Sequence, residues 1–327
     1  MGLELIELVP IFMVFILYFL GMPIVYALFG STFFYFTFID TTSKNWLILQ
    51  KVMTSTQSFS MLAIPFFVMA GSVMNYGGIS DKMMDFAEVL TGHMKGGLAQ
   101  VNVVLSMLMG GCSGSANADC AMQSKMLVPE MEERGFNRAF SAAVTASSAL
   151  ISPMIPPGVM LILYASITEN SVLDMFMAGY LPGILMCIVL MLAVTYVSHR
   201  DGYRPVREKR ATAKEILHGL VECFWAILMI VVLIVGLRSG IVTATEGGAV
   251  LCVLCVFVGM IIYRELHPRD LVVVAKEAFA SVANVFGIII SATVFGLYLT
   301  YAQIPQKLTS LILGMDVGPI GFLLLVN

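Results

Sequence analysis

Residues 98–128 read LAQVNVVLSMLMGGCSGSANADCAMQSKMLV, and the architecture that we expect is built around them. Two apolar runs, Leu98–Cys112 and Ala116–Val128, flank the triplet Ser113-Gly114-Ser115. As helices they would be about 22 Å and about 20 Å long, whereas a membrane crossing needs about 30 Å. Glycines in the centre permit a sharp turn. The pattern predicts a re-entrant helical hairpin with its tip at membrane depth. The alternative is one long, tilted helix that is kinked at the glycines.

A proline-broken helix is predicted over residues 136–168. The small apolar run Ala139–Leu150 is followed by SPMIPPG at Ser152–Gly158, and a helical pattern resumes at Val159–Ile167. Each proline lacks an N–H donor and clashes with the preceding turn, so this segment should stop the helix near the bilayer middle. Irregular backbone at that depth is tolerated only where it is buried or lines a polar cavity. A simple kink is the alternative.

The composition is that of a membrane protein. Of 327 residues, 59% are hydrophobic and 12% are charged, with a mean hydropathy of +0.91, whereas soluble domains carry about 25% charged residues. The net charge of −3 excludes a broad basic surface for nucleic acid, and the apolar content excludes a disordered chain. Glu4 and Glu7 do not fit a cleavable signal. We predict an all-α polytopic membrane protein with a single integral membrane domain, residues 1–327.

Further apolar runs predict the other spans. The first, Leu8–Ile39, is long for one crossing, and Gly21, Pro23 and Gly30 could tilt or kink it. The segment Ser80–Leu90 predicts a short amphipathic helix at the membrane interface. The remaining predicted spans are Phe59–Tyr76, Ser171–Ser198, Leu217–Leu237, Gly247–Tyr263, Leu271–Tyr301 and Leu308–Val326.

Charges between the spans give an orientation. The loop from Arg200 to Lys214 holds six of the 18 Lys and Arg residues, so the positive-inside rule places residues 199–216 in the cytoplasm. The loop Glu169–Asp174 has no Lys or Arg and suits the opposite side. Thr243–Glu246 fits a capping box, in which Glu246 caps the next helix rather than serving as a transport carboxylate.

A faint internal repeat is visible. Within 55–198, a span, a Gly-Gly turn and an amphipathic helix lead into the hairpin 98–128 and the broken helix 136–168. Residues 217–327 hold further spans and the start of a second copy, with a turn at Gln303-Ile304-Pro305. Inverted repeats with broken helices near the midplane are typical of secondary transporters.

The hairpin tip carries the candidate ligands. Serine hydroxyls, the amide carbonyl of Asn117 and freed backbone carbonyls are hard oxygen ligands that suit an alkali cation, and helix N-termini favour an anionic group. The break at Ser152–Gly158 could supply facing carbonyls. Asp119 is the one acid of the hairpin, and an intramembrane carboxylate is a functional candidate. The alternative is that Asp119 has a structural role, either accepting hydrogen bonds from backbone N–H groups of the hairpin or pairing with Lys125.

Other chemistries have weaker support. Gly111–Gly114 spells G-x-S-G, as in intramembrane serine proteases, but a serine nucleophile needs a neighbouring base, and all four histidines lie in or near charged flanks. We therefore do not expect an enzyme. Cys252 and Cys255 lie inside an apolar run, which favours packing over redox or zinc chemistry, and no disulfide framework is expected.

The sequence resembles the large membrane subunit of TRAP (tripartite ATP-independent periplasmic) transporters. The matching stretches follow one order along nearly the whole chain: Gly114–Asp119, Leu127–Met131, Arg134–Phe136, Ala139–Ser148, Ile155–Pro157, Ala178–Gly183, Thr243–Glu246 and Gln303–Pro305.

This resemblance implies a function. It implies sodium-driven import of organic anions, such as C4-dicarboxylates or sugar acids, across the bacterial inner membrane, by an elevator-like movement of a transport domain. It also implies two partners, a small four-helix membrane subunit and a periplasmic substrate-binding protein. No organic cofactor is expected.

The resemblance also assigns the site residues. It places a sodium site on the hairpin tip and the broken helix, at Ser113, Gly114, Ser115, Asn117, Ser152, Ile155, Pro156 and Gly158. The residues that we expect to bind the carboxylate substrate are Ser115, Asn117, Asp119, Ser148 and Pro157. Asn117 and Cys120 depart from the residues usual in the family, which leaves the substrate preference open.

The family continues beyond Asn327 with a second hairpin and a second proline-broken helix, which this sequence does not contain. We therefore expect one half of the substrate-and-sodium site, in a fragment or a truncated gene product. The rival interpretations are a passive channel, a non-transporting membrane fragment and, more remotely, the intramembrane serine protease.

Overall fold

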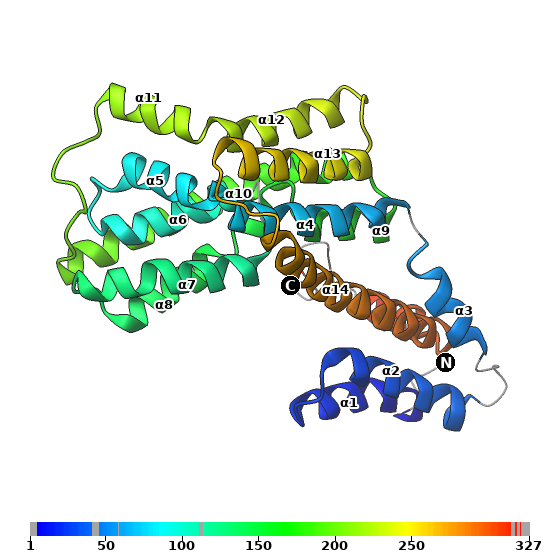
Figure 1. The fold of residues 1–327 in the computed structure, drawn as a ribbon. Helices are drawn as coiled ribbons and strands as arrows, with labels where there is room; N and C mark the ends of the chain where they lie inside the picture. Colours follow the sequence, from blue (N-terminus) through cyan, green and yellow to red (C-terminus); the bar gives the residue numbers. More distant parts are fainter. Residues whose placement is uncertain are drawn as a thin grey trace. The chain divides into compact units, whose positions relative to one another are not determined.

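A computed structural model describes residues 5–40, 46–57, 59–110, 114–314, 318 and 321. In this part of the chain we find fifteen α-helices and no strand (Figure 1), which confirms the predicted all-α class. The helices are α1 (Leu5–Phe19), α2 (Ile24–Phe34), α3 (Trp46–Thr54), α4 (Ala63–Tyr76), α5 (Ile79–Thr91), α6 (Gly97–Gly110), α7 (Ala116–Glu133), α8 (Arg138–Ser148), α9 (Val159–Thr168), α10 (Val172–Asp201), α11 (Ala213–Glu222), α12 (Phe224–Arg238), α13 (Ala244–Phe257), α14 (Asp270–Tyr301) and α15 (Ile304–Gly314).

Short segments of other helical types complete the fold. Two π-helical segments, Tyr35–Ile39 and Val258–Ile262, extend α2 and α13, and 3₁₀ turns lie at Phe59–Leu62 and Ser152–Met154. The chain divides into two compact units, which are described separately: residues 1–57 with 283–327, and residues 58–282.

Three described helices are long and apolar enough to cross a membrane: Val172–Asp201, Ala244–Ile262 and Asp270–Tyr301. Two bent pairs raise this number to five if each pair is one span. One pair is Arg138–Met154 with Val159–Thr168, bent by 47°, and the other is α11 with α12, bent by 65°. The chain is therefore a polytopic membrane protein.

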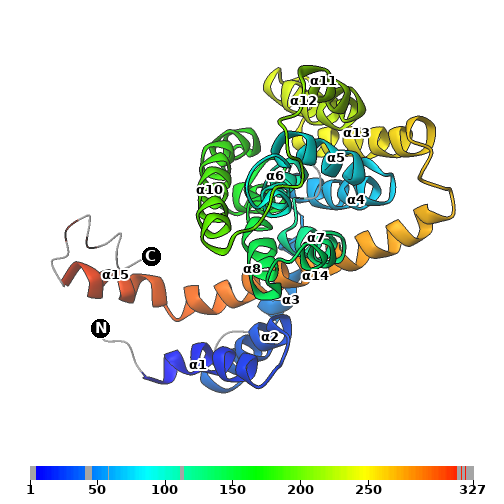
Figure 2. The same cartoon turned by 90° about the vertical axis from the view of Figure 1, so that its left-hand side faces the viewer.

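The unit of residues 58–282 is built on two helical packings. Helix α4 packs along α13, where Gly248 fits against the ring of Phe67 and Gly77 approaches Gly259, as small residues allow in membrane interfaces. The α6–α7 hairpin packs against α8, and α6 also contacts α5 and α10. Figure 2, turned by 90°, looks approximately along α6 and α7.

The unit of both chain ends has its own core. Tyr35, Phe36, Tyr298, Ala302 and Ile304 are buried together. The Tyr298 hydroxyl donates to the Glu7 carbonyl oxygen, and the Lys307 ammonium pairs with the Glu7 carboxylate. These contacts join α14 and α15 to α1.

The predicted span over Leu8–Ile39 is wrong in detail, because two helices, α1 and α2, replace one kinked crossing. Gly21 has a φ of +87°, its N–H donates to the Tyr18 carbonyl, and the Met22 N–H donates to the Leu17 carbonyl. This is a Schellman motif, which ends a helix. Pro23 then lies at the N-cap of α2, directly before its first residue, Ile24.

Other predicted bounds also change. The predicted span Leu217–Leu237 is the bent pair α11 and α12, and α10 and α11 shorten the predicted loop 199–216 to residues 202–212. The second helix of the hairpin runs past its predicted bound at Val128, because α7 continues to Glu133. Proline has no N–H, so Pro129 cannot bond to the Lys125 carbonyl one turn earlier. Lys125 and Pro129 are both exposed, so water can reach this carbonyl. The predicted span Leu308–Val326 lies largely outside the described residues.

Candidate functional site

The described hairpin tip lies against the proline break. Gly114 has a φ of +55°, and a Cβ atom there would lie 2.9 Å from the Pro157 carbonyl oxygen and 3.1 Å from the Val159 nitrogen. A Cβ on Gly110 would lie 3.0 Å from the Ser152 carbonyl oxygen. Only glycine permits such close backbone approach. The two segments that the sequence singled out are thus in direct contact.

Two kinds of helix terminus meet at this contact. Helices α7 and α9 begin here, at Ala116 and Val159, whereas α6 and the turn at Ser152–Met154 end here. N-termini present N–H groups and partial positive charge, and C-termini present carbonyls and partial negative charge. The junction therefore offers donors for an anion beside acceptors for a cation.

The predicted tip residues differ in exposure. Ser115 is half-buried and caps α7, where its Oγ accepts a hydrogen bond from the Ala118 N–H at 3.4 Å. Asn117 is exposed on the first turn of α7, and Gly114 is buried. Ser113 lies outside the described residues.

The predicted residues of the break are buried: Ser152, Ile155, Pro156, Pro157 and Gly158. The Ile155 side chain packs between Gly110 and Gly183 of α10, so only its main chain remains to act as a ligand. Most ligands of this segment would accordingly be carbonyl oxygens. Within the described residues, no group of three His, Cys, Asp or Glu is arranged to hold a metal ion.

Asp119 is buried inside the hairpin, with 1% of its surface exposed. Gln123 joins the two helices, because its Nε2 donates to the Ser106 Oγ at 2.8 Å and to the Asp119 Oδ2 at 3.4 Å. Ser106 lies eight residues before Gly114 and Gln123 nine residues after it, which is the register of an antiparallel hairpin rather than of one kinked helix. Lys125 is exposed. The Asp119 carboxylate thus accepts a hydrogen bond from a side chain of its own helix, and its predicted roles, in substrate binding or in the structure, stay predictions.

Ser148 belongs to a buried network. Its hydroxyl donates to the Asn102 Oδ1 at 2.6 Å, and the Asn102 Nδ2 donates to the Thr145 Oγ1 at 2.8 Å. This network joins α6 to α8. Its centre, Asn102, was not among the predicted site residues. The only signal in the sequence was a row of polar residues, Gln100, Asn102 and Ser106, within an apolar run.

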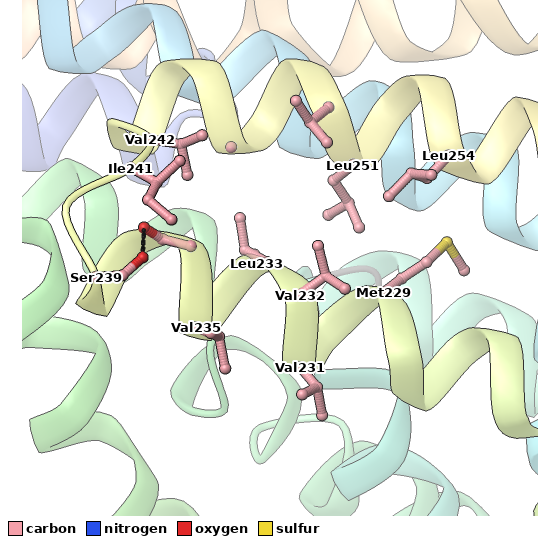
Figure 3. Close-up of a pocket in the computed structure, with 13 residues that line it drawn as sticks. Met229, Val231, Val232, Leu233, Val235, Ser239, Ile241, Val242, Leu251 and Leu254 are labelled. Atoms are coloured by element: carbon pink, nitrogen blue, oxygen red, sulfur yellow. Dashed lines mark hydrogen bonds between the residues drawn. The ribbon is translucent and has the colours of Figure 1, made fainter.

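A separate cavity of about 380 Å³ lies between α12 and α13 (Figure 3). Its lining is apolar except for Ser239, whose hydroxyl donates to the Gly236 carbonyl at 3.1 Å. Figure 3 shows Leu233, Leu251 and Met229 extending into the space between the two helices. Such a lining offers nothing to a carboxylate, so the junction of tip and break remains the candidate site.

The fold and the junction define a class: an all-helical membrane protein in which a helical hairpin contacts a proline-broken helix. A sequence model of the family described as "Tripartite ATP-independent periplasmic transporter, DctM component" matches residues 11–327. The chain belongs to this family, which confirms the resemblance found in its motifs. The family is one of transporter permeases, not of enzymes, and it places the chain in the bacterial inner membrane.

Curated relatives agree with the family assignment. The chain is 33% identical over 311 residues to the sialic acid TRAP transporter large permease protein SiaM of Vibrio cholerae. The aligned residues make up 95% of this chain and 72% of the relative. It is 36% identical over 296 residues to the 2,3-diketo-L-gulonate TRAP transporter large permease protein YiaN of Escherichia coli. These residues make up 90% of this chain and 68% of the relative. It is 33% identical over 277 residues to the C4-dicarboxylate TRAP transporter large permease protein DctM of Pseudomonas aeruginosa. These residues make up 85% of this chain and 64% of the relative. A further relative is covered over 50% of its length, so the chain spans about half to three quarters of these proteins.

Proposed function

We propose that the chain serves as the large transmembrane subunit of a sodium-coupled importer of small organic anions. The observation that carries this proposal is the contact of Gly114 with Pro157 and Val159. It brings two helix N-termini, which favour a carboxylate, next to two C-terminal ends whose carbonyls suit sodium. The substrates named for the three relatives, sialic acid, 2,3-diketo-L-gulonate and C4-dicarboxylate, are all organic acids.

Coupling would arise at the junction itself. Sodium held by carbonyls of Gly114 and the break would neutralise the C-terminal ends and order the tip, so that the carboxylate meets a formed site. Sodium and substrate would then favour the same state, and each would raise the affinity for the other by the same factor. The loaded domain would cross the membrane by an elevator-type movement. The proposed partners are a small membrane subunit and a periplasmic binding protein, as expected for the large component of a tripartite system.

The test is sodium-dependent uptake by the complete transporter, reconstituted with its small subunit and binding protein. The double substitution Ser115→Ala with Asn117→Ala should raise the sodium concentration for half-maximal uptake by roughly tenfold, as expected when about 1.4 kcal/mol of ligand interaction is lost. Ser124→Ala, at an exposed position two turns further along α7, is the matched control and should leave it unchanged. Unchanged sodium dependence in the double variant would remove these residues from the site, and uptake without a sodium gradient would favour a passive channel.

A further inference from the structure

Helix α11 meets α12 at an angle of 65°. If α12 runs close to the membrane normal, α11 must lie closer to the plane of the membrane. A capping box fixes its start, because Thr212 N–H and hydroxyl groups both donate to the Glu215 carboxylate at 2.7 Å. The helix therefore begins firmly at the end of the basic loop and turns away from the spanning segment.

One face of α11 packs onto the protein. Gly219 is buried, and a Cβ atom there would lie 3.0 Å from the Phe86 ring of α5. Lys82 pairs with Glu222 at 3.9 Å across the same interface. This face contains small and charged residues rather than large apolar ones.

The other face of α11 is apolar and uncovered. Ile216, Leu217, Leu220 and Val221 recur at helical spacing, with between 38% and 62% of each side chain exposed. Phe224, at the start of α12, continues this stripe with 49% exposed. The stripe lies away from Gly219, so α5 cannot cover it. An apolar face beside a polar one is typical of helices that lie in the membrane interface.

Unpaired cations precede and border this stripe. Residues 202–214 hold five Lys or Arg against one acid, Glu208. Arg207 is engaged with Glu88 at 3.7 Å and with Glu215 at 3.9 Å. Across the described residues, no carboxylate pairs with any of the other four, which are exposed: Arg204, Lys209, Arg210 and Lys214.

We propose that residues 204–224 form a docking surface for the anionic phospholipids of the cytoplasmic leaflet. The apolar stripe enters the boundary between headgroups and acyl chains, and the four free cations contact headgroup phosphates. Charge complementarity selects this occupant, because the cytoplasmic leaflet carries negative surface potential that attracts basic segments next to membrane helices. The positive-inside rule places these residues on that side.

The experiment compares hydrogen exchange of residues 213–222 in the full chain, embedded in nanodiscs of phosphatidylcholine alone or with about one third phosphatidylglycerol. Exchange should be slower with the anionic lipid, by roughly fivefold for each cation that contacts a headgroup. Raising the salt concentration should reduce the difference, because screening weakens exposed charge pairs.

Two variants separate charge from folding. Arg204→Gln, Lys209→Gln, Arg210→Gln and Lys214→Gln together should abolish the lipid difference, whereas Arg204→Lys, Lys209→Arg, Arg210→Lys and Lys214→Arg together should keep it. Leu217→Asn with Val221→Asn should speed exchange in both lipids. Equal exchange of the wild-type chain in the two lipids would overturn the proposal. So would protection that arises only when the small subunit is added, because the stripe would then bind a protein.

Discussion

At Gly114 the backbone has a φ of +55°, and the residue touches the carbonyl of Pro157. Two separate requirements for glycine thus coincide at the tip: a left-handed conformation and the space for a close approach. Gly135 has a φ of +85° with no atom within 4 Å of a Cβ position, so it shows the first requirement without the second. Comparing substitutions at Gly114 and Gly135 therefore separates the effect of the contact between tip and break from the effect of the left-handed conformation.

We predict that Gly114→Ala destabilises the protein more than Gly135→Ala does. Both should cost about 1–2 kcal/mol for the left-handed conformation, but only Gly114→Ala adds overpacking against the break, about 1–3 kcal/mol. Thermal unfolding in detergent measures the difference, and uptake by the complete transporter shows its effect on function. Equal loss in the two variants would mean that the contact between tip and break contributes nothing to stability.

Residues whose role depends on local geometry could be predicted from the sequence. The three prolines at 153, 156 and 157 predicted the break, because proline acts on its own turn. Ser148 shows the limit. Its hydroxyl donates to Asn102, a partner 46 positions away, and its predicted role in substrate binding stays a prediction. The spacing of residues within one helix carries no information about which distant side chain accepts such a hydrogen bond.

Helix α6 is held by buried polar side chains on three sides. Gln100 Nε2 donates to the Thr195 Oγ1 of α10 at 2.9 Å, Asn102 bonds to α8, and Ser106 accepts from Gln123 of α7. All three residues are fully buried. In an apolar surrounding such bonds add specificity, because lost partners cannot be replaced by water.

Substitution Asn102→Leu should lower the free energy of unfolding by about 1–3 kcal/mol. It removes the acceptor of the Ser148 hydroxyl and the donor to Thr145, and a buried group left without a partner costs this amount. Thermal unfolding of the purified chain is the measurement. Asn170→Leu, at an exposed loop position, is the matched control and should change stability little. A small effect at Asn102 would show that the network relaxes around the substitution.

Element boundaries were predicted less well than element types. Hydropathy located the apolar part of Leu217–Leu237, but it could not show that the chain bends at Cys223, where α11 ends and α12 begins. Next to the bend, Gly219 packs on Phe86, a contact between residues far apart in sequence that hydropathy does not show. The amphipathic segment Ser80–Leu90 was located well as α5. Helix α5 packs on α6 and α11, and its predicted place at the membrane interface stays a prediction.

At the scale of the whole molecule, the internal repeat has a structural counterpart. Tyr76-Gly77-Gly78-Ile79 and Tyr301-Ala302-Gln303-Ile304 each join an apolar helix to an amphipathic one, and the third residue has a positive φ in both, +70° at Gly78 and +54° at Gln303. A left-handed conformation is uncommon for Gln, so its recurrence supports the repeat. The described residues hold no second hairpin, and the repeat stays a prediction.

The predicted orientation of the chain can be checked by labelling with a membrane-impermeant maleimide in cells. In a variant with all six native cysteines replaced by alanine, Asn170→Cys should be labelled from outside the inner membrane. Lys209→Cys should be labelled only after the membrane is opened, because the basic loop is retained in the cytoplasm. Labelling of Lys209→Cys in intact spheroplasts would reverse the proposed topology.

The compact unit formed by both ends of the chain has a consequence for synthesis. Residues 1–57 share a compact unit with residues 283–327, so α1 and α2 leave the ribosome before α15 and much of α14 exist. At about 5–20 residues per second, they wait on the order of 10–45 s while residues 58–282 are made. During that time Glu7 has no Lys307 to pair with. The contacts that join α1 to α14 and α15 therefore form only after nearly the whole chain has been made.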